Sequence, residues 1–345
     1  MKYWKKLTSL GLALALVLSL AACGQKEEPA PEVEDEPQVE APEAEPEQTE
    51  APEDDTVVRM AALKGPTGMG LAYLEELGGG SYDLTIAAKP DEVNPLLLKG
   101  ELDVACVPAN AAAVLNAKSQ GEIITLGINT LGVLYMVEKG DEVQSFEDLR
   151  GKTIVTSGKG MTPEYVLRYL LTENGIDPDK DVTIEWKSEH SESISALATG
   201  AATVAMMPQP FVTVAQTKLE GLRVALDMTQ EWAALDNGSQ LLTGVVVARK
   251  SFVEEHTALV EKLLADYAAS VEKVNADPAA AGARIGEMNI VDAKIAEKAL
   301  PFCNIVCITG TEMKDAMSGY LQILFDADPT SVGGQMPGDD FYFGA

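Results

Sequence analysis

The stretch SFEDLRGKTIVTSGKGMTPEYVLRYLL, residues 145–171, decides the fold. It predicts a short helix, a buried strand at 152–156, a Gly-rich loop and a second helix. Thr162 is a suitable N-cap because its hydroxyl can accept from a first-turn amide, and Pro163 would then occupy the first helical position, where its missing N–H costs nothing. The loop 157–161 is therefore expected at the carboxyl end of a strand and the positive end of a helix, where open α/β sheets bind ligands. Taken alone, the loop is equally consistent with a tight connection whose glycines only make the turn.

The same order of strand, loop and helix recurs along the chain. Further strands are predicted at 56–63, 82–87, 102–107, 123–128, 182–186, 202–206, 222–227 and 240–248. Helices are predicted at 71–77, 91–99, 111–117, 191–198 and from 211 to about 217. From residue 250 onward the pattern is helical, with helices at 250–276, 279–287, 291–300 and 312–326. Short apolar strands that alternate with helices indicate an α/β fold with mostly parallel sheets covered on both faces.

The first 23 residues have the pattern of a targeting segment. Lys2, Lys5 and Lys6 form a basic region, residues 7–20 are apolar, and Leu-Ala-Ala-Cys ends at Cys23. This ending resembles the bacterial lipobox, which implies cleavage before Cys23 and lipidation of its thiol. The alternative is a plain secretory signal with an incidental cysteine. No second apolar run reaches the ~18 residues that span a bilayer, so we expect lipid alone to hold the protein at the membrane.

Residues 24–55 are predicted to be a disordered tether. They contain fourteen acidic residues against the single base Lys26, several prolines and no aromatic residue. Such a segment cannot bury enough apolar surface to offset the loss of chain entropy. We expect it to hold the folded part away from the membrane, on the outer surface of a Gram-positive-type cell.

The whole chain of 345 residues has a formal net charge of −28. Nucleic acid is therefore not an expected partner, because its recognition requires basic patches. The charge does not make the ligand a cation, since a pocket can be locally positive on an acidic protein.

The remaining three cysteines are predicted to be structural. Cys106 lies in an apolar strand and is expected to be an inert core thiol. Cys303 and Cys307 could pair in an extracellular setting, but two cysteines four residues apart rarely reach disulfide geometry. Without nearby histidines they are also a poor zinc signature. We favour free or buried thiols, and we expect no metal and no cofactor.

Two motifs carry a resemblance to a known family. Residues 137–171, with the sequence DLRGKTI at their centre, and residues 196–211, ALATGAATVAMMPQPF, resemble the type II periplasmic-binding-protein fold. Val204-Ala205 stands where an acidic residue and alanine are usual, a departure of little consequence for the fold. The chain is most similar to the nitrate/sulfonate/taurine and thiamine-pyrimidine binding subfamilies of ABC transporter substrate-binding lipoproteins.

The resemblance implies two lobes with a ligand cleft between them. Lobe one would comprise residues 56–130 plus 243–345, and lobe two residues 131–242. The chain would cross between the lobes at 131–137 and 241–247, where a closing hinge could lie.

The cleft would be lined by the loops that follow the strands. These loops offer free amides, small hydroxyls and adaptable methionines, as a desolvated polar ligand requires. The expected ligand-binding residues are Gly65, Pro66, Thr67, Gly68, Met69, Pro108, Asn110, Asn129, Thr130, Ser157, Gly158, Lys159, Gly160, Met161, Thr162, Pro208 and Gln209.

The sequence gives little support for an enzyme. His190 and His256 are the only histidines, and neither is expected at a Gly-rich loop, although His190 precedes a helix that could approach the cleft. No GxSxG, HExxH or Walker motif is present. We therefore expect a monomeric binding protein that delivers a small polar or anionic solute, such as a sulfonate or a pyrimidine, to an ABC permease. A sensing receptor without transport and a thiamine-pyrimidine-synthase-like enzyme are the alternatives.

Overall fold

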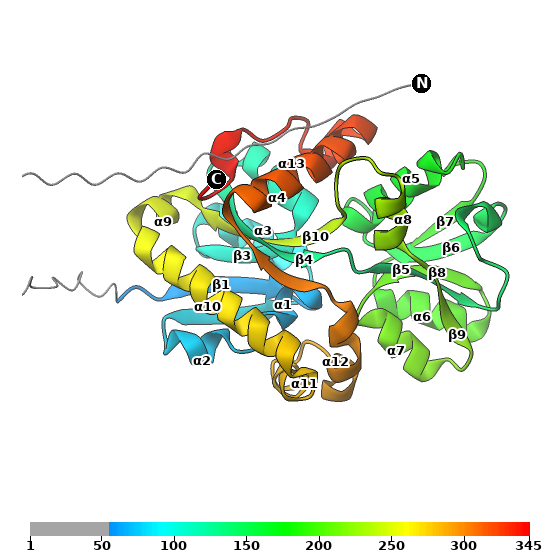
Figure 1. Ribbon diagram of the computed structural model, residues 1–345, viewed down its shortest axis with the longest axis horizontal. Coiled ribbons are helices and arrows are strands. Elements are labelled where there is room, and N and C mark those ends of the chain that lie inside the picture. The colour runs from blue at the N-terminus through cyan, green and yellow to red at the C-terminus, as the bar shows by residue number, and fades with distance from the viewer. Residues whose placement is uncertain (1–54) are drawn as a thin grey trace, which may run out of the picture. The chain divides into compact units, whose positions relative to one another are not determined.

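The computed structural model describes residues 55–345, which form two mixed β-sheets flanked by helices (Figure 1). The predicted signal peptide, the lipid site at Cys23 and the tether as far as residue 54 lie outside the described residues. Within 55–345, no helix combines the length and the apolar character needed to cross a bilayer.

The first sheet has six strands in the order β11-β4-β10-β3-β1-β2. Its members are β1 (Val58–Leu63), β2 (Tyr82–Ala87), β3 (Val104–Pro108), β4 (Ile123–Leu131), β10 (Leu242–Arg249) and β11 (Ile305–Ile308). Strand β1 pairs in parallel with β2 and β3, whereas β10 runs antiparallel to both β3 and β4, and β11 antiparallel to β4.

The second sheet has five strands in the order β7-β6-β8-β5-β9. Its members are β5 (Leu134–Lys139), β6 (Thr153–Ser157), β7 (Thr183–Lys187), β8 (Val204–Pro208) and β9 (Leu222–Asp227). Strand β6 pairs in parallel with β7 and β8, and β5 runs antiparallel to β8 and β9.

The sheets are mixed because the chain passes between them. Strand β4 ends at Leu131 and β5 begins at Leu134 in the other sheet, so β5 starts at the edge that faces the first sheet and runs away from it. The chain later returns to the first sheet, and strand β10 likewise begins at the edge that faces the other sheet and runs away from it. These two strands therefore oppose their neighbours, which corrects the expectation of mostly parallel pairing.

Thirteen α-helices lie within the described part of the chain. Those between strands of the first sheet and before the crossing are α1 (Pro66–Met69), α2 (Leu74–Gly78), α3 (Pro90–Lys99) and α4 (Ala109–Lys118). Those associated with the second sheet are α5 (Thr162–Glu173), α6 (His190–Thr199), α7 (Phe211–Lys218) and α8 (Met228–Ala234). The C-terminal helices are α9 (Lys250–Glu255), α10 (Thr257–Ala276), α11 (Pro278–Glu287), α12 (Ala293–Ala299) and α13 (Gly310–Ala327).

Alternating side chains give each sheet two buried faces. In β10, Val245 and Val247 belong to the cluster with α3, α4 and α13, whereas Val246 and Ala248 pack with α2 and α10 on the other side (Figure 1). The same alternation in β5 places Met136 toward α5 and α8, and Val137 toward α6 and α7. This two-residue period is what a sheet covered on both faces requires.

Several elements differ from the sequence prediction. The helix expected at 71–77 is replaced by the single turn α1 and by α2, and the helix expected at 250–276 is divided at His256. Strand β11 lies in a region expected to be helical, and β5 occupies most of the first predicted crossing. Strand β4 extends to Leu131, so Asn129 and Thr130 lie within the strand instead of after it.

The described cysteines are free thiols, as predicted. Cys106 and Cys303 are buried, and Cys307 is partly buried. Burial raises the pKa of Cys106 to about 12, which keeps this thiol neutral and inert.

Candidate functional site

Seven of the buried polar residues lie at one edge of the two sheets. The predicted residues Thr67, Asn110, Asn129, Thr130, Ser157, Thr162 and Gln209 are all buried, although each carries a hydrogen-bonding side chain. They lie at or just after the carboxyl ends of β1, β3, β4, β6 and β8. Buried polar groups need partners, so their concentration at the strand ends marks a candidate binding site.

Gly244, near the start of β10, lies where the residues at the carboxyl ends of β1, β3 and β4 meet. It pairs with Pro108 of β3 and Thr130 of β4. A Cβ atom at Gly244 would lie 2.4 Å from Cγ2 of Thr67 and 2.5 Å from Oδ1 of Asn129. Only glycine allows this approach, and the sequence prediction did not include it.

Asn110 and Thr162 connect the helices that follow β3 and β6. The hydroxyl of Thr162 donates to Oδ1 of Asn110 at 3.2 Å, and Nδ2 of Asn110 donates to the carbonyl of Ser331 at 3.1 Å. The N-cap of α5 is Met161, and no side chain caps the helix there. The predicted capping role of Thr162 is therefore wrong, because its hydroxyl points to α4 instead of to its own first turn.

Ser157 forms the shortest polar contact of the site. Its Oγ lies 2.6 Å from Nδ1 of His190, the first residue of α6. The imidazole packs on Phe211, the first residue of α7, with ring centroids 4.4 Å apart. The ends of β6, β7 and β8 thus converge on one histidine.

His190 is the functional candidate that sequence reasoning missed, since it was not expected at a Gly-rich loop. The parallel register pairs Ser157 with Lys187, which places the start of α6 beside the end of β6. A register argument for these two strands could have found the pair. Burial lowers the pKa of His190 to about 4, so the imidazole is neutral at neutral pH.

Other predicted residues are less available for a ligand. Met69 is fully buried in the core, and Gln209 uses its Oε1 to accept from the backbone N–H and the hydroxyl of Thr213. The backbone N–H of Gly160 donates to Glu164 at 2.7 Å, so this amide is not free as expected. Gly65, Pro66 and Gly68 are buried, Gly158, Met161 and Pro208 are partly buried, and Lys159 and Gly160 are exposed.

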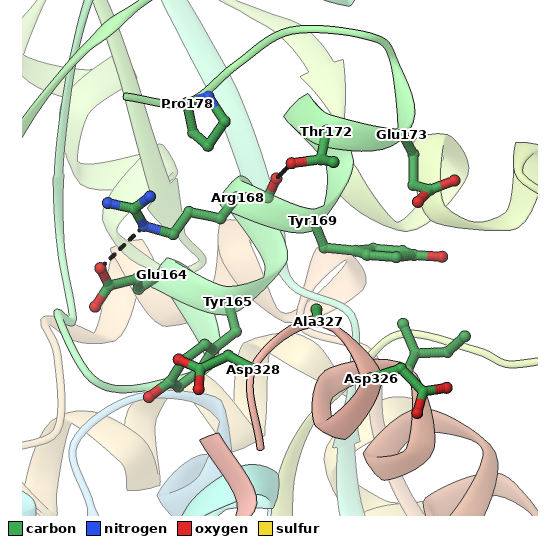
Figure 2. Close-up of a pocket in the computed structure, with 11 residues that line it drawn as sticks. Glu164, Tyr165, Arg168, Tyr169, Thr172, Glu173, Pro178, Asp326, Ala327 and Asp328 are labelled. Carbon is green, nitrogen blue, oxygen red and sulfur yellow. Dashed lines mark hydrogen bonds and ion pairs between the residues drawn. The ribbon is translucent and has the colours of Figure 1, made fainter. Parts of the chain in front are cut away.

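A separate cavity of about 770 Å³ lies between α5 and the end of α13 (Figure 2). Its lining residues are Glu164, Tyr165, Arg168, Tyr169, Thr172, Glu173, Pro178, Ile323, Asp326, Ala327 and Asp328. None of the predicted site residues belongs to it. The arginine that lines the cavity, Arg168, is paired with Glu164 and Asp179. The carboxylates of the lining are therefore in excess and disfavour an anionic ligand.

The chain forms two mixed β-sheets, and the polar ends of their strands lie near the segments where the chain crosses from one sheet to the other. This arrangement is a two-lobed α/β fold. The chain belongs to the family described as "ABC transporter, phosphonate, periplasmic substrate-binding protein", whose model matches residues 67–289. This membership confirms the resemblance to substrate-binding proteins of ABC transporters.

Solved structures share the fold. An ABC transporter protein from Parabacteroides distasonis is 26% identical with a TM-score of 0.70, and the similarity covers 84% of this chain and 99% of that one. The periplasmic aliphatic sulphonate binding protein from Escherichia coli is 16% identical with a TM-score of 0.65, covering 81% and 94% of the two chains.

One curated relative is similar over a shorter stretch. An L-glutamate/L-aspartate-binding protein from Pseudomonas aeruginosa is 28% identical over 114 residues. The match spans 33% of this chain and 35% of the relative.

Proposed function

We propose that this protein is the membrane-anchored, extracytoplasmic substrate-binding subunit of an ABC importer. It would capture a small anionic or acceptor-rich organic solute between two lobes and deliver it to a permease. We retain the lobe boundaries 56–130 plus 243–345 and 131–242 as part of this proposal, together with lipidation at Cys23.

The contact between Asn110 and Thr162 is the single observation that carries the proposal. These buried side chains come from helices that follow strands of different sheets, and they meet at 3.2 Å. A ligand held at these strand ends would touch both sheets at once. Such a ligand stabilises whichever arrangement brings the two sheets together, which is the basis of capture by lobe closure.

The chemistry of the strand ends favours an acceptor-rich ligand. Helices α4, α5 and α6 begin at this edge, and helix N-termini favour negative charge. Ser157 adds a hydroxyl and the neutral ring of His190 adds a polar nitrogen, whereas the hydroxyl hydrogen of Thr162 is already donated to Asn110. The sulphonate named for one structural neighbour and the phosphonate named for the family fit this chemistry.

A thermal-shift screen followed by small-angle scattering tests the proposal. The panel comprises alkanesulfonates, alkylphosphonates, carboxylates, pyrimidines and organic cations. We expect the melting temperature to rise with an anionic member and the radius of gyration to fall at saturation. Preference for a cation would refute the ligand class, and an unchanged radius at saturation would refute capture by closure.

Hydrolysis is a second candidate, favoured by the 2.6 Å contact between Ser157 and His190. A serine nucleophile needs a base that a third group orients. Within residues 55–345, the other ring nitrogen of His190 has no carboxylate partner. We therefore favour binding, and turnover of p-nitrophenyl acetate that is lost in Ser157→Ala would reverse that preference.

A further inference from the structure

We propose that binding of an oxyanion at the candidate site is coupled to uptake of one proton by the Ser157–His190 pair. The pair would thereby select ligands that present two acceptor oxygens on one group, as sulfonates, carboxylates and phosphonates do. This inference rests on the proposed function, because it concerns the same site.

The number of protons on the pair determines what it can donate. In the neutral pair, the hydroxyl and the imidazole carry one hydrogen each, and one of the two occupies the 2.6 Å contact. One hydrogen then remains for a ligand, whichever tautomer is present. In the protonated pair, Nδ1–H donates to Oγ, so both the hydroxyl hydrogen and Nε2–H are free to donate outward.

An anion with two oxygens therefore gains most from the protonated pair. It receives two hydrogen bonds instead of one, and one of them is charge-assisted. No covalent bond forms or breaks at the ligand. The proton comes from solvent and returns to solvent when the ligand leaves.

The surroundings of His190 keep the free pair neutral. The ring of His190 packs on Phe211, which shields it in part from water, and burial lowers the pKa of His190 to about 4. The adjacent Glu189 opposes this shift, but Glu189 also pairs with Lys89 at 3.6 Å.

The remaining charged groups around α6 are largely paired. On β7, Lys187 and Glu185 form an ion pair at 2.8 Å. Glu192 accepts from the backbone N–H of Ser188, and β6 and β8 carry no charged side chain. Lys159, in the loop after β6, and Lys218, at the far end of α7, are exposed. A bound anion is thus the charge change best placed to raise the proton affinity of His190.

The coupling makes affinity depend on pH in a defined direction. A neighbouring opposite charge shifts a pKa by about 1–3 units, so the bound pair should titrate well above the free pair. Affinity should therefore be highest below the bound-state pKa and fall by about tenfold between about pH 5.5 and about pH 8.

Isothermal titration calorimetry of the full chain with methanesulfonate tests the proposal. This probe keeps one negative charge across the range, so exchanged protons belong to the protein; methylphosphonate is the second probe. At about pH 5.5, heats in two buffers of different ionisation enthalpy should show uptake of at least about half a proton. His190→Gln should bind with no uptake and without the tenfold pH dependence.

The chain offers a matched control in its other histidine. His256 lies between α9 and α10 and packs on Phe252, so His256→Gln should leave proton uptake unchanged. With only two histidines, NMR titration of the wild type also separates them directly. The His190 resonances should titrate near pH 4 without ligand and at a higher pH with it.

The outcomes separate the two hypotheses. Binding of either anion without proton uptake, or titration of His190 that is unchanged by ligand, overturns the coupling and leaves the proposed function in place. If neither anion binds at about 10 mM, the binding free energy is less favourable than ~3 kcal/mol. That result overturns the oxyanion site and the coupling together.

Discussion

The hydroxyl of Thr162 donates to Oδ1 of Asn110 at 3.2 Å, and this buried hydrogen bond joins the first turns of α5 and α4. Both side chains are almost fully buried. The contact thus links the strand-end edge of one sheet to that of the other.

Replacing Thr162 with Val should lower the free energy of unfolding by about 1–3 kcal/mol, because the buried Oδ1 of Asn110 loses a donor. Urea denaturation measures this change. Thr199→Val is the matched control, since the exposed hydroxyl of Thr199 donates only to the carbonyls of its own helix and should contribute less than about 0.5 kcal/mol. Equal losses in the two variants would show that the contact between the helices is unimportant.

Gly244→Ala should destabilise the protein by about 1–3 kcal/mol, because the new Cβ would overlap Thr67 and Asn129. It should also weaken ligand binding, since both neighbours belong to the candidate site. Gly319 of α13 is the control: a Cβ there meets its nearest atom, in Ser239, at an ordinary 3.5 Å. Gly319→Ala should stabilise by about 0.4–1 kcal/mol, and thermal melting of both variants gives the comparison. A stable Gly244→Ala variant with normal affinity would contradict the close approach.

Asp103→Asn should lower stability without changing ligand affinity. Asp103 lies before β3, at the end of the strand opposite the candidate site, and accepts from Arg59 and Arg249 at 2.6 Å each. Burial opposes ionisation of this carboxyl, but the two arginines outweigh it and leave its pKa below the usual range. Hydrogen bonds to charged groups contribute about 1.5–3 kcal/mol, which sets the expected loss at neutral pH.

The pH dependence of that loss follows from the depressed pKa. The stabilisation is fully present above the pKa that Asp103 has in the unfolded state, near 3.8. It disappears as the pH falls through the lower pKa that Asp103 has in the folded state. Urea denaturation of wild type and variant should therefore differ at neutral pH and converge below about pH 4. If the difference in stability between wild type and Asp103→Asn grew as the pH was lowered, the lowered pKa of Asp103 would be contradicted.

Cys23→Ala should release the protein from the membrane into the medium, because the lipobox-like sequence implies that lipid on this thiol is the anchor. Cell fractionation and immunoblotting measure the distribution. Cys106→Ala is the control, since this buried thiol belongs to the folded part and should leave the protein membrane-bound. Retention of Cys23→Ala in the membrane fraction would show that another feature anchors the chain.

Much of the fold could be predicted because local pattern and tertiary packing agree. The strands 82–87 and 222–227 have the bounds of β2 and β9. Strand β11 was missed because four residues, most of them only partly buried, carry too little pattern beside long helices. Its place depends on pairing with β4, which is distant in sequence.

The candidate site was only partly predictable, for a similar reason. The Gly-rich segment that begins at the end of β6 has a local sequence signature, so Ser157, the last residue of that strand, was predicted. His190 lies 33 residues later in a polar segment, and only the pairing of β6 with β7 brings it to Ser157. Likewise, nothing near Thr162 in the sequence indicates that its hydroxyl would turn to Asn110 instead of capping its own helix.

Strands β4 and β10 pair side by side, with Leu131 opposite Leu242. Residues 132–241 are therefore an insertion into what would otherwise be a β-hairpin of the first sheet. The two ends of the insertion lie one strand spacing apart, about 4.8 Å. A segment attached at two adjacent points can be exchanged for a homologous one through two junctions. Chimeras made at Leu131 and Leu242 would transplant Ser157 and His190 as a unit and leave the six-stranded scaffold unchanged.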